Sequence, residues 1–269
     1  METRIFSYKH SSISYLRFGD GPRLVVCFHG YGEQASGFDF LEKVEGFTFI
    51  AIDLPFHGST KWNEKLNFTG SDLTLIVQGI LAHEGLWEKN MTLLGFSLGG
   101  RVSLSLFELM PDRIERMVLL APDGLKLNFW YWLSTQTWIG KKAFSFTMHR
   151  PGWFFALLNL LNRLRLVNPS VYKFVNYYID DKQARMELYK RWIVLRKLRP
   201  DRNKIKKLIK SRNIPVRLIY GKHDKIILPV RGEKFRKGIE ENCTITIIPS
   251  GHQVLHAKHA DEIRAALHH

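Results

Sequence analysis

Three residues of this chain have side chains that together can perform nucleophilic hydrolysis: Ser97, Asp224 and His252. A serine hydroxyl is a weak nucleophile at neutral pH unless a base removes its proton during the attack. Histidine suits that task because its pKa lies near the working pH. The imidazolium that forms then needs a fixed carboxylate to orient and stabilise it. These residue types therefore predict a hydrolytic site, provided that the fold brings them together.

The residues around Ser97 predict the elements that would hold it. Met91–Leu94 is a compact apolar run typical of a buried strand, and a four-residue apolar repeat after Ser97 predicts a helix. Between them lies the pattern Gly-x-Ser-x-Gly, at residues 95–99. A sharp strand-to-helix turn exposes the serine oxygen, and its glycines are needed because a Cβ would collide with the backbone. The alternative is an ordinary turn with a surface serine.

The rest of the chain alternates between predicted strands and helices. A fully apolar run at residues 24–28 and a mostly apolar run at 47–52 predict strands covered on both faces, as in a mostly parallel sheet with helices on either side. Such sheets place their sites at the carboxyl ends of the strands. Reactive residue types follow six of the predicted strands: His29, Asp53, Ser97, Asp123, Asp224 and His252.

The motifs at these strand ends resemble those of the α/β-hydrolase family. Five of them stand in the family's order: the oxyanion loop His29–Gly32, the loop Asp53–Ser59, the nucleophile elbow Gly95–Gly100, the acid loop Gly221–Asp224 and the histidine loop Gly251–His252. Phe56 stands where the family has a glycine. The resemblance covers about residues 1–124 and 214–269, and it implies an α/β-hydrolase core with a helical lid inserted at 125–213.

The resemblance implies a role for each candidate residue. Ser97 would be the nucleophile, His252 the base and Asp224 the acid, in the family's order along the chain. Asp123 is an alternative acid because it ends the strand that follows the elbow strand, and the family sometimes places its carboxylate there. His29 and His57 are interpreted as structural hydrogen-bonding residues of their loops.

Two main-chain amides are predicted to form the oxyanion hole. Negative charge on the former carbonyl oxygen must be met by donors that are already in place. The resemblance implies the N–H of Leu98, directly after the nucleophile, and that of Tyr31, in the loop after the third strand. Leu98 also begins a helix, whose dipole favours an anion.

A metal site is considered at the C-terminal histidines and is not predicted. His256 and His259 would share a helical face with His252, but no carboxylates converge on that face. Cys27 and Cys243 fall in predicted strands without Cys-x-x-Cys spacing, so we interpret them as reduced core thiols. The chemistry needs no cofactor.

The net charge of +15 is confined to one segment. Residues 125–213 contain 20 Lys and Arg and 4 Asp and Glu, so they carry 20 − 4 = +16 and the remainder 15 − 16 = −1. Three interpretations stay open: a solubilising surface, an anionic partner such as an acyl carrier, coenzyme A or a lipid headgroup, and nucleic acid. No nucleic-acid-binding motif accompanies the charge, so we predict no nucleic-acid partner.

The same segment holds five of the seven tryptophans and is predicted to be helical. Trp153, Leu157, Leu160, Leu161 and Leu164 share a helical face, which we expect to point inward as an acyl pocket beneath a cationic outer face. The predicted substrate-binding residues are Phe96, Trp130 and Trp153. Packing of the aromatic side chains against the core is an alternative interpretation, compatible with the first.

Together these features predict a cofactor-independent serine hydrolase that cleaves a small carboxylic ester with an apolar acyl chain. Alternatives are thioester, amide or C–C hydrolysis on the same triad, an acyl-carrier or lipid substrate, and a non-catalytic ligand-binding protein. Residues 1–10 carry no apolar run typical of a signal peptide, and no long apolar span predicts a transmembrane segment. We therefore expect a cytoplasmic protein.

Overall fold

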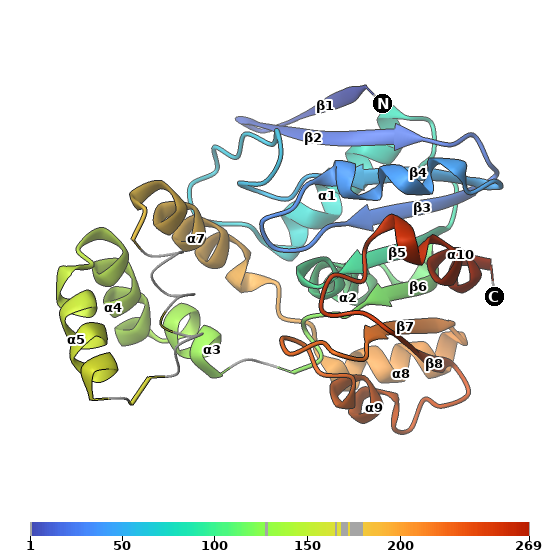
Figure 1. Ribbon diagram of the computed structural model, residues 1–269. Helices are drawn as coiled ribbons and strands as arrows, with labels where there is room; N and C mark the ends of the chain where they lie inside the picture. Colours follow the sequence, from blue (N-terminus) through green and yellow to red (C-terminus); the bar gives the residue numbers. More distant parts are fainter. Residues whose placement is uncertain (1, 127–128, 165, 168–171, 173–179, 269) are drawn as a thin grey trace. The chain divides into compact units, whose positions relative to one another are not determined.

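The computed structural model describes residues 2–126, 129–164, 166–167, 172 and 180–268. These residues form two compact units (Figure 1). The first unit comprises residues 1–64, 68–126 and 197–269, and the second comprises residues 65–67 and 127–196.

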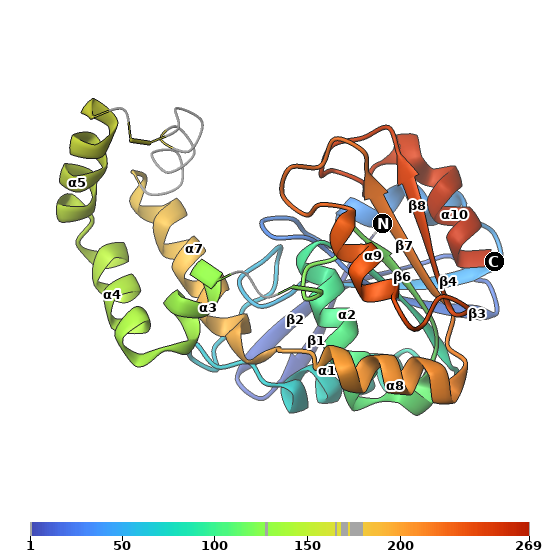
Figure 2. The same ribbon diagram turned by 90° about the horizontal axis from the view of Figure 1, so that it is seen from below.

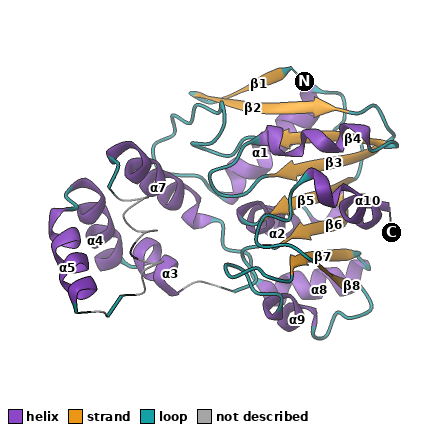
Figure 3. Ribbon diagram, in the orientation of Figure 1, coloured by secondary structure: helices purple, strands orange, loops and turns teal. Residues whose placement is uncertain are grey.

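The first unit is built on one eight-stranded sheet in the order β1-β2-β4-β3-β5-β6-β7-β8 (Figure 3). β1 and β2 are antiparallel to each other, and β2 is antiparallel to β4, while all pairs from β4 to β8 are parallel. The strands are β1 (Thr3–Tyr8), β2 (Ser11–Phe18), β3 (Arg23–Phe28), β4 (Phe47–Ile52), β5 (Met91–Phe96), β6 (Ile114–Leu120), β7 (Val216–Gly221) and β8 (Cys243–Ile248). The mostly parallel sheet predicted from the sequence is confirmed.

Helices cover both faces of this sheet. α1, α2 and α8 lie on one face and α10 on the other (Figure 2), which is why β4 and β5 are buried along their whole length. The helices are α1 (Gly70–His83), α2 (Leu98–Leu109), α8 (Arg202–Arg212), α9 (Val230–Arg236) and α10 (Ala260–His268), with 3-10 helices η1 (Ala35–Lys43), η2 (Pro111–Arg113) and η4 (Ala257–His259).

Local capping fixes where two helices of the first unit begin. α1 begins after Thr69, whose hydroxyl accepts from the Asp72 N–H while the Asp72 carboxylate accepts from the Thr69 N–H. This capping box satisfies two main-chain donors at the start of α1. The C-terminal helix α10 begins at Ala260, directly after the 3-10 turn η4, which His256 caps.

The second unit consists of helices among its described residues. They are α3 (Phe129–Gln136), α4 (Trp138–His149), α5 (Gly152–Arg163) and α7 (Lys182–Val194), followed by η3 (Leu195–Lys197) at the boundary. The Arg196 guanidinium donates to the Leu66 carbonyl at 2.8 Å, which ties residues 65–67 to this unit. The helices α3 and α7 both pack against α4.

The compact units divide the chain at different residues from the predicted lid boundary. The sequence predicts an insertion over 125–213, whereas the second unit ends at Arg196. Residues 197–213 belong to the first unit because α8 buries Ile205 and Ile209 and contacts α2 of the same unit.

The two cysteines lie in the core of the first unit. Cys27 and Cys243 are both buried and not joined in a disulfide. Burial raises the pKa of the Cys27 thiol, and it raises the pKa of Cys243 to about 12. Both thiols are therefore protonated at neutral pH and act as small apolar side chains.

Within the described part of the chain, no helix is both long and apolar enough to cross a bilayer.

A buried carboxylate, Glu84, joins the end of α1 to β1 and β2. It accepts hydrogen bonds from the Tyr15 hydroxyl at 2.5 Å, the Arg17 guanidinium at 2.8 Å and the Arg4 guanidinium. Burial by itself would raise the pKa of Glu84, but the hydrogen bonds from these three partners outweigh it and lower the pKa to about 2. The native state therefore favours the ionised form more than the unfolded chain does.

We expect Glu84→Gln to lower the free energy of unfolding at pH 7 by about 1–3 kcal/mol, since charged hydrogen bonds are lost. A lowered native pKa stabilises the fold above the unfolded value near 4.5, and this contribution disappears as the pH falls toward 2. The difference between wild type and variant should therefore shrink between about pH 5 and pH 2. Urea unfolding across this range measures it, with exposed Glu45→Gln as the control. A pH-independent difference would contradict the assignment.

Candidate active site

Ser97 lies in the turn between β5 and α2 with φ 48° and ψ −111°, a left-handed φ that is costly for a residue with a Cβ. Main-chain hydrogen bonds hold Ser97 in this conformation. The Ser97 N–H donates to the Leu120 carbonyl at 2.9 Å, and the Ser97 carbonyl accepts from the Asp123 N–H at 2.8 Å. A Cβ at Gly95 would strike Gly99, and one at Gly99 would strike the Phe28 backbone. The turn therefore needs its glycines, as the sequence predicts.

The structure brings His252 and Asp224 to Ser97. The His252 Nε2 lies 3.0 Å from the Ser97 Oγ, and its Nδ1 lies 2.7 Å from the Asp224 Oδ2. Because a carboxylate only accepts, Nδ1 carries the ring proton and donates to Asp224. The Nε2 lone pair is then left to accept the serine hydroxyl proton.

The Asp224 carboxylate is fixed from its other side. Its Oδ1 accepts from the main-chain N–H groups of Ile226 at 2.7 Å and Ile227 at 2.9 Å, and the side chain is fully buried. These bonds aim Oδ2 at the imidazole of His252. The acid loop thus supplies a rigid acceptor for the ring.

The alternative acid, Asp123, is engaged elsewhere. Its Oδ2 lies 3.4 Å from the Arg101 Nε, and its Oδ1 accepts from the Gly124 N–H at 2.7 Å. The histidine contacts Asp224 in the structure. The main chain of Asp123 nevertheless supports the elbow through its bond to the Ser97 carbonyl.

The predicted oxyanion residues occupy the ends of two adjacent elements. Leu98 is the first residue of α2, so its N–H is one of the amides at a helix start that have no intrahelical acceptor. Tyr31 follows β3, whose partner in the sheet is β5. Neighbouring parallel strands end at the same edge, which brings the Tyr31 loop beside the elbow.

His29 fixes the start of the Tyr31 loop. The Leu54 N–H donates to the His29 Nε2 at 3.1 Å, so the ring proton lies on Nδ1 and donates to the Gly30 carbonyl at 2.8 Å. This is a structural role for a neutral imidazole. His57 likewise bonds through Nδ1 to the Pro55 carbonyl at 3.0 Å.

Asp53 organises the loop that follows β4. Its buried carboxylate accepts from the Ala35 N–H at 2.7 Å and the Ser59 N–H at 3.1 Å. Phe56, which replaces the glycine of the family pattern, has φ 62°. The loop therefore keeps the left-handed conformation that glycine would adopt more readily.

A polar bridge that the sequence analysis missed joins the two loops of the site. The Glu33 carboxylate accepts from the Gly30 N–H at 3.2 Å and from the Gln253 side-chain amide at 2.9 Å. It links the oxyanion loop to the residue next to His252. Nothing in the spacing of these residues signals the contact, since they lie 220 positions apart.

The predicted substrate-binding residues have different environments. Phe96 is almost fully buried, and its ring centroid lies 5.4 Å from that of His252, so it packs beside the imidazole. Trp153 lies on α5 and is 47% exposed. Trp130 belongs to α3, but its side chain lies outside the described residues. The α5 face expected to point inward is largely solvent-exposed, with Leu157, Leu160 and Leu164 on it.

The histidines after His252 do not share a helical face with it. Residues 252–256 are not helical, because the 3-10 turn η4 begins only at Ala257. His256 caps this turn by accepting from the Lys258 N–H at 3.1 Å. His259 is buried, and burial lowers its pKa.

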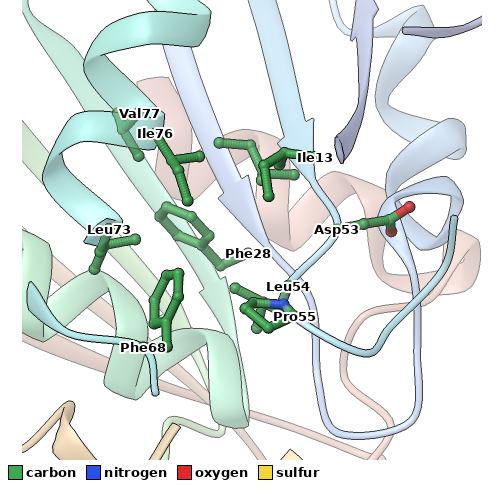
Figure 4. A pocket seen from close by; sticks show the side chains of 10 residues that line it. Ile13, Phe28, Asp53, Leu54, Pro55, Phe68, Leu73, Ile76 and Val77 are labelled. Carbon is green, nitrogen blue, oxygen red and sulfur yellow. The ribbon is translucent and has the colours of Figure 1, made fainter. Parts of the chain in front are cut away.

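A small cavity lies between β2, β3, the Asp53 loop and the first turns of α1 (Figure 4). Its volume is about 10 Å³, on the scale of one water molecule. It is lined mostly by apolar side chains: Ile13, Phe28, Leu54, Phe68, Leu73 and Ile76 among them. It is too small for an acyl chain.

Comparison with known proteins gives the same assignment for the fold. The hydrolase YugF of Bacillus subtilis is 26% identical over 251 residues, which are 87% of this chain and 85% of YugF. An esterase of Mycobacterium tuberculosis is 30% identical over 117 residues, 43% of this chain and 39% of its own. The structure of a thermophilic esterase from Thermogutta terrifontis superposes with a TM-score of 0.68 at 16% identity, covering 100% of this chain and 97% of that one.

The family model described as the alpha/beta hydrolase fold matches residues 23–258. The match includes all three residues that meet at the elbow, and it spans the strands β3 to β8. The chain therefore belongs to the α/β-hydrolase family and is an α/β-hydrolase enzyme.

Proposed function

We propose that the protein is a serine hydrolase that cleaves a carboxylic ester through an acyl-enzyme. The observation that carries this proposal is the continuous hydrogen-bonded line from Ser97 through His252 to Asp224, with contacts of 3.0 and 2.7 Å. These distances lie within the reach that proton transfer between a nucleophile and its base requires.

The first half of the reaction forms the acyl-enzyme. The His252 Nε2 removes the Ser97 proton as the Oγ attacks the ester carbonyl, and Asp224 stabilises the resulting imidazolium. The carbonyl π bond opens and places a negative charge on oxygen. When the tetrahedral intermediate collapses, the bond to the leaving oxygen breaks, and His252 gives its proton to the departing alcohol.

The amides of Leu98 and Tyr31 receive the oxyanion in this mechanism. Both donors are main-chain groups, so the side chains of these two residues are not what the chemistry requires. The start of α2 adds the positive end of a helix dipole. Preplaced donors of this kind contribute about 10²–10³-fold in rate each.

The second half repeats the same chemistry with water. His252 removes a proton from a water molecule, whose oxygen attacks the acyl carbonyl to give a second tetrahedral intermediate. As this intermediate collapses, the bond between the acyl carbon and the Ser97 Oγ breaks, and the protonated ring returns its proton to Oγ. The products are a carboxylic acid and a regenerated serine. Every proton passes through the one imidazole nitrogen that faces the serine.

The choice of an ester is supported by two proteins named as esterases, one in sequence and one in structure. Among α/β-hydrolases, the nucleophile supports many reactions, and the loops set the substrate. We propose that the inserted second unit serves as the lid, and that apolar side chains of this unit outside the exposed positions of α4 and α5 favour acyl chains of medium length.

Covalent labelling tests the proposal directly. A fluorophosphonate probe is expected to react once, and digestion with mass spectrometry should find the label on the peptide that contains Ser97. A panel of p-nitrophenyl esters of increasing acyl length should then show turnover, greatest for medium chains. An unlabelled, folded protein would favour a non-catalytic ligand-binding role. A labelled protein that cleaved only thioesters or amides would overturn the ester assignment.

A further inference from the structure

Exposed apolar side chains are concentrated on two helices of the second unit. Of the fifteen large apolar side chains that are exposed among the described residues, eight lie between Trp138 and Leu166. Single exposed apolar residues are ordinary on protein surfaces, whereas a cluster marks an interaction site. The position of this cluster shows which surface is involved.

The exposed side chains of α4 and α5 each follow a helical repeat. On α4 the exposed positions include Ile139, Lys142 and Phe146, three or four residues apart. On α5 they include Leu157 and Leu160, whereas Leu158 is buried. The two helices contact each other and are joined through Arg150 and Pro151. We call the resulting surface the α4–α5 face: Ile139, Lys142, Phe146, Arg150, Leu157 and Leu160.

The charge of this region is entirely positive. Residues 124–179 contain no Asp or Glu, and they contain seven basic residues. Lys142, Arg150 and Arg163 are exposed on or beside the α4–α5 face. The Lys142 ammonium lies 4.0 Å from the ring centroid of Trp138, so cation and indole share one part of the surface. Basic and apolar groups are therefore interspersed.

We propose that the α4–α5 face docks onto the surface of an anionic lipid bilayer. Interfacial helices combine an apolar face with lysines and arginines, and they lie in the headgroup region without spanning the membrane. Tryptophan is enriched at that depth, and each basic residue near an anionic surface contributes about 1 kcal/mol. An acidic protein would match the cations, but it leaves the exposed leucines and phenylalanine unexplained. The bilayer matches both.

The test is binding to vesicles by co-sedimentation, made in a Ser97→Ala background so that no lipid is cleaved. Because the assay measures no turnover, it is independent of the proposed esterase activity. The Ser97→Ala protein, whose surface is otherwise that of wild type, should bind vesicles made from equal parts of phosphatidylglycerol and phosphatidylcholine. The binding affinity should fall by about tenfold or more when the vesicles are pure phosphatidylcholine, or when the salt concentration is raised to about 0.5 M.

Paired variants separate the two contributions. Leu157→Ser with Leu160→Ser should weaken binding about tenfold through lost apolar area. Lys142→Gln with Arg150→Gln should weaken it roughly 30-fold at low salt. The matched controls lie in the first unit, at the half-exposed Leu75→Ser on α1 and the exposed Lys207→Gln on α8, and should bind within about twofold of wild type.

Four results would overturn the proposal. They are a folded protein that does not bind anionic vesicles, equal binding to neutral vesicles, binding that depends on the cation pair but not on the leucine pair, and a dimer in sedimentation velocity that the leucine pair abolishes. The third result would assign the face to an acidic macromolecule, and the fourth to a second copy of the chain. Circular dichroism checks folding. If the leucine variant does not fold, the cation pair and the lipid dependence decide.

Discussion

Ser97→Ala is expected to lower kcat for a p-nitrophenyl ester by about 10⁶-fold, the loss seen when a triad nucleophile is removed. The His252 Nε2 has the Ser97 Oγ at 3.0 Å, and the histidine ring itself is held by Asp224 on its other side. Stopped-flow and steady-state kinetics with a purified, folded variant measure the effect.

The matched control for this variant is Ser71→Ala, an exposed serine at the start of α1. This control also removes one serine hydroxyl, but at a position far from the elbow in sequence. Its kcat should equal that of wild type within about twofold. The fluorophosphonate label should be lost from the Ser97 variant and kept in the control. Ester turnover that survives in folded Ser97→Ala would defeat the acyl-enzyme mechanism.

Asp224→Asn is expected to lower kcat by about 10⁴-fold while leaving the fold intact. An asparagine can donate its amide proton to the His252 Nδ1. The ring proton then moves to Nε2, the nitrogen that faces Ser97, and the imidazole no longer has a lone pair for the serine proton. Two main-chain donors, at Ile226 and Ile227, would still hold the side-chain oxygen, so the geometry should change little.

Asp123→Asn is the discriminating control because Asp123 is the rival acid by position in the chain. Its carboxylate pairs with Arg101, and it is partly exposed, so its replacement should cost less than about fivefold in kcat. The pair of variants is measured with the same ester and compared by kcat. The reverse ranking, with Asp123→Asn the damaging change, would move the acid to the end of β6.

The fold was predictable because its signals are local and strong. The apolar runs of β3, β4 and β5 predict strands covered on both sides, and the elbow glycines leave one turn geometry for Ser97. Strand ends in a parallel sheet converge at one edge. Convergence of strand ends predicts that six reactive side chains lie near one edge, and the family resemblance selects Ser97, Asp224 and His252 among them.

Other features were not predictable, for separate physical reasons. The contact of Glu33 with Gln253 joins loops far apart in sequence, and no periodicity marks it. The end of the inserted unit depends on which core buries Ile205 and Ile209, a tertiary choice that a helical repeat does not encode. The environment of α5 was not predictable either. The spacing of its apolar residues predicts an apolar face, but spacing does not say whether other residues of the protein, solvent or a lipid surface cover that face.

The Glu33 bridge couples two loops that arrive from opposite ends of the chain. The Glu33 carboxylate accepts from the Gly30 main-chain amide and from the Gln253 side chain, so the loop with the proposed oxyanion amide of Tyr31 and the loop with His252 share one anchor. Movement of either loop is opposed by its hydrogen bond to Glu33, which the other loop also holds. In the proposed mechanism, the distance between the His252 ring and the amides that receive the oxyanion is therefore set when the protein folds, before substrate binds.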